Sequence, residues 1–269
     1  MNSPASPPMT FEFHGQTDTG RSRANNEDSI AIDAENGLIV LADGMGGYNA
    51  GEVASHMATT FLHTELGRWL GETGPNAADA DVRRAMDICV DNANRAIFDA
   101  ASSNPQYAGM GTTLVVAAFR EGRVLVGHVG DSRAYRLRQG RLVQITRDHS
   151  LLQEQLDAGL ITQEQAAYAT HRNLVTRAVG VEDTVLLELH VHETMADDLY
   201  LLCSDGLSDM LSDESIAQVL SGGGDSLQDL GDSLVDAANE AGGKDNIAVI
   251  LARVRGGGSA SKFWWPFRR

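Results

Sequence analysis

The sequence predicts a fold of the α+β class, formed by one large domain. Short apolar runs with the length of β-strands occur together with longer segments in which apolar residues recur at helical spacing. Strands and helices come in two groups each, without the regular strand–helix–strand rhythm of a parallel sheet. With 269 residues, 42% of them apolar, the chain is long enough to bury a substantial core. We therefore expect one domain over residues 10–255, with a short lead-in and a tail.

Composition and charge exclude several classes of function. The formal net charge of −16 argues against nucleic-acid binding, which needs a basic face. The two cysteines, Cys89 and Cys203, indicate neither a disulfide framework nor a cysteine-bound zinc, and they fit a reducing compartment. The Pro/Ser-rich residues 1–9 lack the features of a signal peptide, and no apolar stretch reaches the ~18 residues of a membrane span. We expect a cytoplasmic protein with a disordered lead-in over residues 1–9.

The first half of the domain is expected to place three strands before two helices. The strands, separated by polar turns, are predicted over about residues 11–17, 29–33 and 37–42. From Asn49 to about Leu70 apolar residues follow helical spacing, with Asn49 as a candidate N-cap and Glu52 three residues later. A second helix fits about residues 77–102.

The second half returns to strands and then to helices. Strands are predicted near residues 112–119, 123–129, 134–138, 185–192, 199–203 and 247–254. After Asp148 the pattern becomes helical, and Thr162 to Gln165 has the form of a capping box. Two further helices are predicted near residues 213–220 and 226–241.

Carboxylates stand at the ends of several predicted strands. In LIVLADG, VLVGHVGDS and LYLLCSDG an apolar run leads through small residues to an aspartate, giving Asp43, Asp131 and Asp205. Two other sites come at the start of a strand and supply Glu27, Asp28 and Asp245. If strands that end in a carboxylate lie antiparallel to strands that begin with one, all these side chains meet at one edge. One strand-terminal Asp-Gly is usually a turn or a helix cap, but five such sites together are hard to explain in that way.

A cluster of like charges needs cations to stay ionised, and oxygen ligands suit Mg²⁺ or Mn²⁺ better than zinc. Several carboxylates imply more than one ion, and two ions ~3.5–4 Å apart can share a water and aim it at phosphorus. The glycines after Asp43 allow backbone carbonyls and water to come close to the ions. Arg23 stands four residues before Glu27, where its planar group can hold a phosphate bidentately.

These motifs resemble a known family. RANNED (23–28), LADGMGG (41–47), GTT (111–113), VGDSR (129–133), LLCSDGL (201–207) and GGKDN (242–246) occur in the order typical of the bacterial, 2C-type branch of the metal-dependent protein serine/threonine phosphatases. The resemblance covers nearly the whole domain. It implies a four-layer α/β/β/α sandwich in which helix pairs flank two mainly antiparallel sheets. It also implies hydrolysis of phosphoserine and phosphothreonine in proteins by a metal-activated water at a binuclear Mg²⁺/Mn²⁺ site.

The resemblance also implies a role for each matching residue. Asp43 bridges both ions, and Gly44 offers its carbonyl oxygen to one of them. The remaining roles fall to Asp205 and Asp245 as ligands of the second ion, to Glu27 and Asp28 acting through metal-bound waters, to Arg23 as the phosphate-binding group, and to Asp131 with Asp205 at a third, weaker metal position. Residues 148–175 correspond to a mobile flap over the site. A cognate bacterial serine/threonine kinase is implied as a partner.

The chain departs from the eukaryotic branch at one position. That branch has a histidine after the Asp-Gly, a proposed proton donor to the leaving group, whereas this chain has Met45. His149 and His171 of the flap segment are alternatives, although a lone loop histidine is usually only solvated. A metal-bound water is the simpler candidate.

Two other functions remain open from the sequence. A phosphatase of small phosphorylated metabolites would use the same site, since the motifs specify phosphate and metals but not the leaving group. A pseudo-enzyme that only binds phosphoproteins is disfavoured because Asp43, Asp205 and Asp245 are all present.

The tail, residues 256–269, combines a glycine-rich linker with two tryptophans, two phenylalanines and three basic residues. We expect it to dock weakly on a membrane surface or on a partner, with packing against the domain as the alternative.

Overall fold

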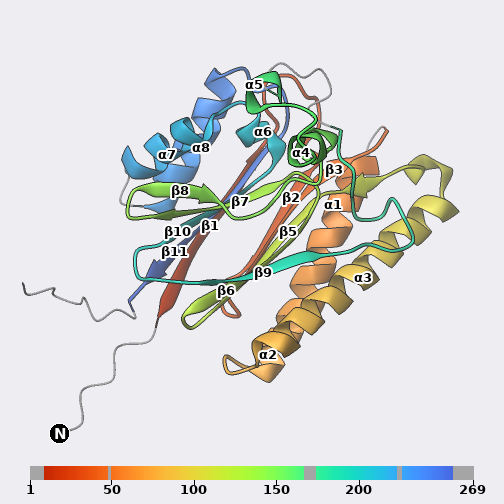
Figure 1. Cartoon of the computed structure of the whole chain (residues 1–269). Helices are drawn as coiled ribbons and strands as arrows, with labels where there is room; N and C mark the ends of the chain where they lie inside the picture. Colours follow the sequence, from red (N-terminus) through yellow and green to blue (C-terminus); the bar gives the residue numbers. More distant parts are fainter. Residues whose placement is uncertain (1–8, 48–49, 167–173, 223–225, 257–269) are drawn as a thin grey trace, which may run out of the picture.

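Two antiparallel β-sheets lie face to face at the centre of the computed structural model, which describes residues 9–47, 50–166, 174–222 and 226–256 (Figure 1). The first sheet has the strand order β1 (Thr10–Asp18), β11 (Ile247–Arg255), β10 (Leu199–Cys203), β7 (Arg133–Arg138) and β8 (Arg141–Gln144). The second has the order β2 (Asp28–Asp33), β3 (Leu38–Met45), β5 (Leu114–Arg120), β6 (Arg123–Val129) and β9 (Glu188–Glu193), and β4 (Gly111–Thr112) pairs with β3.

Helices cover the outer face of each sheet, so the expected four-layer sandwich of the α+β class is confirmed (Figure 1). The helices against the second sheet are α1 (Ala50–Phe61), the π-helical turn η1 (Leu62–Leu66), α2 (Gly67–Thr73) and α3 (Asp79–Ser103), followed by the 3₁₀ turn η2 (Pro105–Tyr107). The helices against the first sheet are the single turn α6 (Asp205–Ser208), α7 (Asp213–Gly222) and α8 (Leu227–Glu240). The helix predicted to end near Leu70 thus continues to Thr73 through a π-helical turn.

The apolar run of β3 shows why its sequence does not alternate with polar residues. Leu38, Val40 and Ala42 point to the core beneath α1 and α3, whereas Ile39 and Leu41 point to the core between the sheets. All five are buried because the strand lies inside the second sheet with a packed layer on each side. The run can end in a carboxylate because Asp43 lies where the strand leaves both cores.

Residues 148–175, which the family resemblance predicts to be a flap, include two short helices in their described part, α4 (Leu151–Asp157) and α5 (Gln163–Ala166). The predicted capping box is confirmed, since the Gln165 backbone N–H donates to Thr162 Oγ1 and the Gln165 side chain accepts from the Thr162 N–H. Backbone hydrogen bonds join the two ends of the flap, from Leu151 N to Leu174 O at 2.9 Å and from Thr176 N to His149 O at 2.8 Å. Both ends of the flap are therefore fixed to each other at the border of the domain.

Some sequence predictions differ from the structure or fall outside its described part. The strand predicted from residue 185 begins only at Glu188, because the preceding residues form a loop that is held by α3. The candidate N-cap Asn49, most of the 1–9 lead-in and of the 256–269 tail, and His171 lie outside the described residues. In the part of the chain that the structure describes, no helix is both long enough and apolar enough to cross a membrane.

Candidate active site

The strand ends bring the predicted carboxylates to one edge of the two sheets. Asp28 begins β2 and lies opposite Asp43 of β3 in the antiparallel register. Asp205 follows β10 and Asp245 precedes β11, and these two strands are also antiparallel neighbours. A cavity of about 340 Å³ opens there, lined by Arg23, Glu27, Asp43, Gly44, Met45, Gly46, Thr113, Asp131, Val175, Asp205, Asp245 and Asn246. Asp28 is the one predicted site residue that is not in this lining; it is buried, opposite Asp43 in the β2–β3 pair.

The backbone of Asp43 is fixed by the GTT segment on the neighbouring strand. Its N–H donates to Thr113 Oγ1 at 3.0 Å, and its carbonyl oxygen accepts from Thr112 Oγ1 at 2.8 Å and from the Thr113 N–H at 2.9 Å. Thr113 Oγ1 is in turn 2.7 Å from Ser132 Oγ, beside Asp131. One network of buried hydroxyl groups thus joins the backbone of Asp43 to the residue that follows Asp131.

Gly44 is required by close packing of the backbone. A Cβ atom at this position would lie 2.1 Å from the Gly51 carbonyl oxygen and 2.7 Å from the Glu27 carbonyl oxygen. The Gly44 N–H also donates to Glu27 O at 3.1 Å. Glycine therefore lets β3, the start of α1 and the Glu27 loop converge, in addition to any contact of its carbonyl with an ion.

Burial and mutual repulsion make the carboxylate cluster unfavourable in its charged form. Burial raises the pKa of Asp28 to about 7 and that of Asp131 to about 6. The pKa values of Asp43 and Asp205 are raised well above their ordinary range, first by burial and then by neighbouring aspartates. The Glu27 pKa is also raised by burial.

The donor set fits divalent cations that prefer oxygen. Ser204 Oγ donates to Asp28 Oδ2 at 2.7 Å, whereas Asp28 Oδ1 is buried without a hydrogen-bond partner among the described residues. A buried acceptor without a donor costs free energy that a cation or an ordered water would recover. Apart from the sulfur of Met45, the polar atoms in the lining are oxygen and nitrogen, with carboxylates predominating, which suits Mg²⁺ or Mn²⁺.

Asn246 organises the loop that carries Glu27, and the sequence reading did not single it out. Its Oδ1 accepts from the Glu27 N–H at 2.8 Å, and its Nδ2 donates to the carbonyl oxygens of Thr19 at 3.0 Å and Asn25 at 2.9 Å. One side chain thereby ties residues 19–27 to the start of β11. In the sequence, this role could have been suspected only from the position of Asn246 directly after Asp245, since asparagine side chains readily form hydrogen bonds with nearby backbone groups.

Arg23 lies at the mouth of the cavity. Its side chain is 50% exposed, and its Nη2 is 2.7 Å from Asp245 Oδ2. The guanidinium is therefore held beside the carboxylates while most of its donors still face solvent.

Asp131 connects the carboxylate cavity with the base of the flap. It follows Gly130, where a φ of +100° and the 2.8 Å at which an added Cβ atom would meet the Thr113 side chain favour glycine. Two residues further on, Arg133 makes a bidentate pair with Asp148, with Nε 3.0 Å from Oδ1 and Nη2 2.6 Å from Oδ2. The loop that carries Asp131 is thus tied to the first residue of the flap.

His149 is buried and engaged, not solvated as a loop histidine usually is. Its Nδ1 accepts from the Gly130 N–H at 3.2 Å, so its Nε2 carries the proton and donates to Glu188 Oε2 at 3.2 Å. Its ring stacks on that of His128 with centroids 4.7 Å apart. The ligand atoms of His128, His149 and Glu188 lie within 4.8 Å of one another. Both ring nitrogens of His149, however, are already engaged in the hydrogen bonds with Gly130 and Glu188. His149 also lies outside the carboxylate cavity lining.

Comparison with known proteins places these residues in a family context. The family model described as protein phosphatase 2C matches residues 16–252. The serine/threonine protein phosphatase PstP of Mycobacterium tuberculosis is 39% identical over 252 residues, which cover 91% of this chain but only 45% of that protein. The serine/threonine phosphatase Stp of Listeria monocytogenes is 37% identical over 246 residues, covering 90% of this chain and 95% of that protein. The chain thus spans about half the length of the mycobacterial relative and nearly all of the Listeria one.

Solved structures agree in fold. A crystal structure of the M. tuberculosis phosphatase PstP/Ppp superimposes with a TM-score of 0.83 at 38% identity, covering 91% of this chain and 99% of that one. A second structure, of the PstP catalytic domain in complex with two manganese ions, has a TM-score of 0.79 at 38% identity and covers 92% and 99%.

Proposed function

The chain belongs to the protein phosphatase 2C family, and we propose that it hydrolyses phosphoserine and phosphothreonine in proteins at a binuclear Mg²⁺ or Mn²⁺ site. The observation that carries the proposal is the convergence of Asp43, Asp205 and Asp245 on one cavity beside Arg23. Strand pairing holds these carboxylates together although their charges repel. A cluster with a purely structural role would not need like charges so close to one another.

We assign the cations to the residues that the family pattern indicates. Asp43 would bridge two ions, with the Gly44 carbonyl on one and with Asp205 and Asp245 on the other. Glu27 and Asp28 would act through waters, and Asp131 with Asp205 would hold a third, weaker ion. The bound ions supply the Lewis acid that activates water for attack on phosphorus and offsets the phosphate charge.

The protein side chains hold and orient the substrate. The Arg23 fork at the mouth of the cavity suits two phosphate oxygens at once, and its exposure leaves these donors accessible. Thr113 and Asn246 keep Asp43 and Glu27 in place through backbone hydrogen bonds, so the site needs little rearrangement on binding. Among the residues that the structure describes, no histidine lines the cavity, so we assign protonation of the leaving group to a water.

Substrate comparison tests this function directly. The purified protein is incubated with a phosphothreonine peptide, a phosphotyrosine peptide and several phosphorylated metabolites, each with Mn²⁺ and with EDTA. We expect Mn²⁺-dependent phosphate release from the phosphothreonine peptide in clear excess over the others. Preference for a metabolite would favour the small-molecule phosphatase, and release from no substrate would favour a phosphoprotein-binding module.

We further propose that the protein is cytoplasmic. We also propose that it dephosphorylates proteins that a bacterial serine/threonine kinase has phosphorylated. Support for the location comes from Cys89 and Cys203, which are buried free thiols. For the tail, residues 256–269, we propose weak docking to a membrane surface or a partner. Its aromatic and basic composition supports this role.

A further inference from the structure

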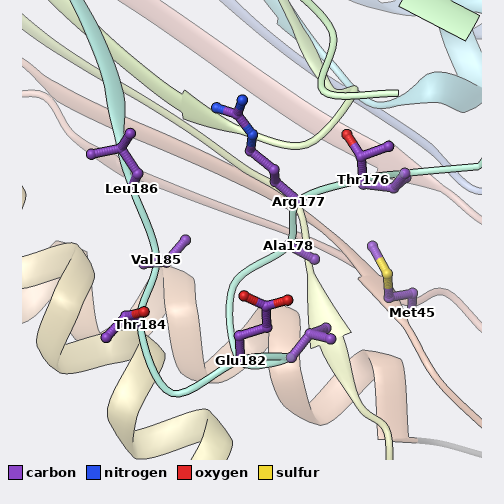
Figure 2. A pocket seen from close by; sticks show the side chains of 10 residues that line it. Met45, Thr176, Arg177, Ala178, Glu182, Thr184, Val185 and Leu186 are labelled. Atoms are coloured by element: carbon purple, nitrogen blue, oxygen red, sulfur yellow. The ribbon is translucent and has the colours of Figure 1, made fainter. Parts of the chain in front are cut away.

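A second cavity adjoins the carboxylate cavity, on the side of the loop that follows the flap. It has a volume of about 620 Å³ and shares Met45 and Val175 with the carboxylate cavity. The remaining lining comes from residues 176–186, whose side chains surround the hollow in Figure 2. The volume lies in the range of ligand-binding pockets, and the shared lining makes the second cavity an extension of the first.

The loop that forms this cavity is fixed to the domain. Val179 pairs with Thr112, with N–H to carbonyl distances of 3.0 and 2.8 Å in the two directions. Asn94 of α3, which is fully buried, accepts from the Gly180 N–H at 2.6 Å and donates to the Glu182 carbonyl oxygen at 3.0 Å. The loop is thus preformed although it contains little regular structure, and a preformed wall loses little entropy on binding.

The surface of the cavity is apolar with polar groups at its sides. Val181 is 51% exposed and Leu186 73% exposed, so both offer apolar surface to a ligand. Thr176, Arg177 and Glu182 add polar groups to the same wall (Figure 2). Arg177 and Glu182 thus add one charge of each sign to the lining of the cavity.

We propose that this second cavity binds the polypeptide next to the phosphorylated residue, with an apolar side chain of the substrate against Val181 and Leu186. The inference deepens the proposed function and rests on it. A phosphorylated residue in the carboxylate cavity must continue into a chain, and the adjoining cavity offers that chain an apolar surface and hydrogen-bonding groups. The occupant is therefore an extended phosphopeptide with an apolar residue beside the phosphoserine or phosphothreonine.

The test compares phosphopeptides with a small substrate that cannot reach the second cavity. Leu186→Asp and Val181→Ser are measured with a phosphothreonine peptide flanked by leucines, with the same peptide flanked by serines, and with p-nitrophenyl phosphate, all with Mn²⁺. Ile88→Asp is the matched control, since Ile88 is 51% exposed on α3 and does not line the cavity.

We expect Leu186→Asp to reduce kcat/KM about tenfold for the leucine-flanked peptide, mainly through KM, because an apolar contact of this size is lost. The serine-flanked peptide and p-nitrophenyl phosphate should change less than about twofold, so the parent's preference for leucine disappears in the variant. Ile88→Asp should match the parent on all three substrates.

Other results would overturn the inference in distinguishable ways. Equal losses on all three substrates would show general damage to the active site, and unchanged peptide kinetics would remove the second cavity from substrate binding. In both cases parent hydrolysis of phosphothreonine peptides would leave the proposed function standing. Failure of the parent on every phosphopeptide would instead refute the proposed function itself.

Discussion

At the scale of single residues, hydrogen bonds between distant segments of the chain support the carboxylates of the site. Ser204 donates to Asp28, and Asn246 accepts from the Glu27 N–H, so these bonds join residues 176 and 219 positions apart. Asp43, Asp205 and Asp245 stand beside apolar strands, and strand pairing alone was enough to predict that they converge. The supporting bonds could not be predicted from a local pattern, because their partners meet only when both sheets have formed.

Arg23 provides the first prediction at this scale. Arg23→Ala should reduce kcat/KM for a phosphothreonine peptide by about 10- to 100-fold, since the bidentate contact to phosphate is lost. Affinity for Mn²⁺, measured by calorimetry, should change little because the ion pair with Asp245 is half exposed and such pairs contribute little. Arg23→Lys should recover part of the loss, since a point charge lacks the fork. Equal kcat/KM in parent and Arg23→Ala would remove the arginine from the site.

Asp28 provides a prediction about pH in the absence of metal. Its pKa of about 7 in the folded protein exceeds the ~3.9 of an unfolded aspartate, so the folded state binds more protons between these values. Its contribution to stability is therefore present below about pH 4 and is lost as the pH rises to about 7. In EDTA, Asp28→Asn should gain thermal stability relative to the parent between about pH 5 and pH 8, by several degrees.

The parent must be compared with Asp28→Asn because other buried groups change the stability of the fold with pH in the opposite direction. Burial lowers the pKa values of His128, His149 and His192, so these side chains favour the folded state as the pH rises. The difference between parent and variant cancels them. A difference in Tm that does not change over this pH range would contradict the assigned protonation of Asp28.

At the scale of elements, strands in the cores were predicted well and the loop after the flap was not. Apolar side chains fill residues 38–42 of β3, 199–203 of β10 and 247–252 of β11, because each of these runs has a packed layer on both faces. Such runs can be recognised without tertiary information. Residues 185–187 have the same apolar composition, yet they belong to a loop whose shape depends on Asn94. The helix after residue 50 was predicted in position, but its π-helical turn left no signal in the spacing.

Asn94 tests whether that loop is fixed by α3. Asn94→Ala should lower the free energy of unfolding by ~1–3 kcal/mol, since it leaves the buried Gly180 N–H without an acceptor and the Glu182 carbonyl oxygen without its donor. Urea unfolding measures the loss, and Asn92→Ala, an exposed position on the same helix, is the control. A variant as stable as the control would show that the loop holds its shape by other contacts.

At the scale of the whole molecule, antiparallel pairing explains why one edge collects the chemistry. Strands that end in a carboxylate pair with strands that begin with one, so residues distant in sequence meet without any loop of unusual length. The layers followed from the family resemblance, whereas the sequence pattern by itself indicated only the α+β class. The second cavity was beyond prediction because its lining comes from a loop without periodic pattern.

The tail allows a prediction at this scale. Deleting residues 256–269 should leave peptide hydrolysis and Tm unchanged and should reduce co-sedimentation with anionic vesicles or with a phosphoprotein substrate. Any attachment should be weak and sensitive to salt, because the segment is short and basic. A clear fall in Tm with unchanged sedimentation would instead assign the tail to the domain.

The central claim is that Asp43 holds two cations whose joint action releases phosphate from phosphothreonine. Phosphate release by Asp43→Asn at saturating Mn²⁺, measured with a phosphothreonine peptide beside the parent, tests this claim most directly. We expect a loss of at least about 1000-fold, since a neutral amide can neither neutralise two ions nor keep them close, and similar losses for Asp205→Asn and Asp245→Asn. Far-UV circular dichroism and Tm confirm that each variant is folded. Release by folded, metal-saturated Asp43→Asn at close to the parent rate would contradict the binuclear mechanism.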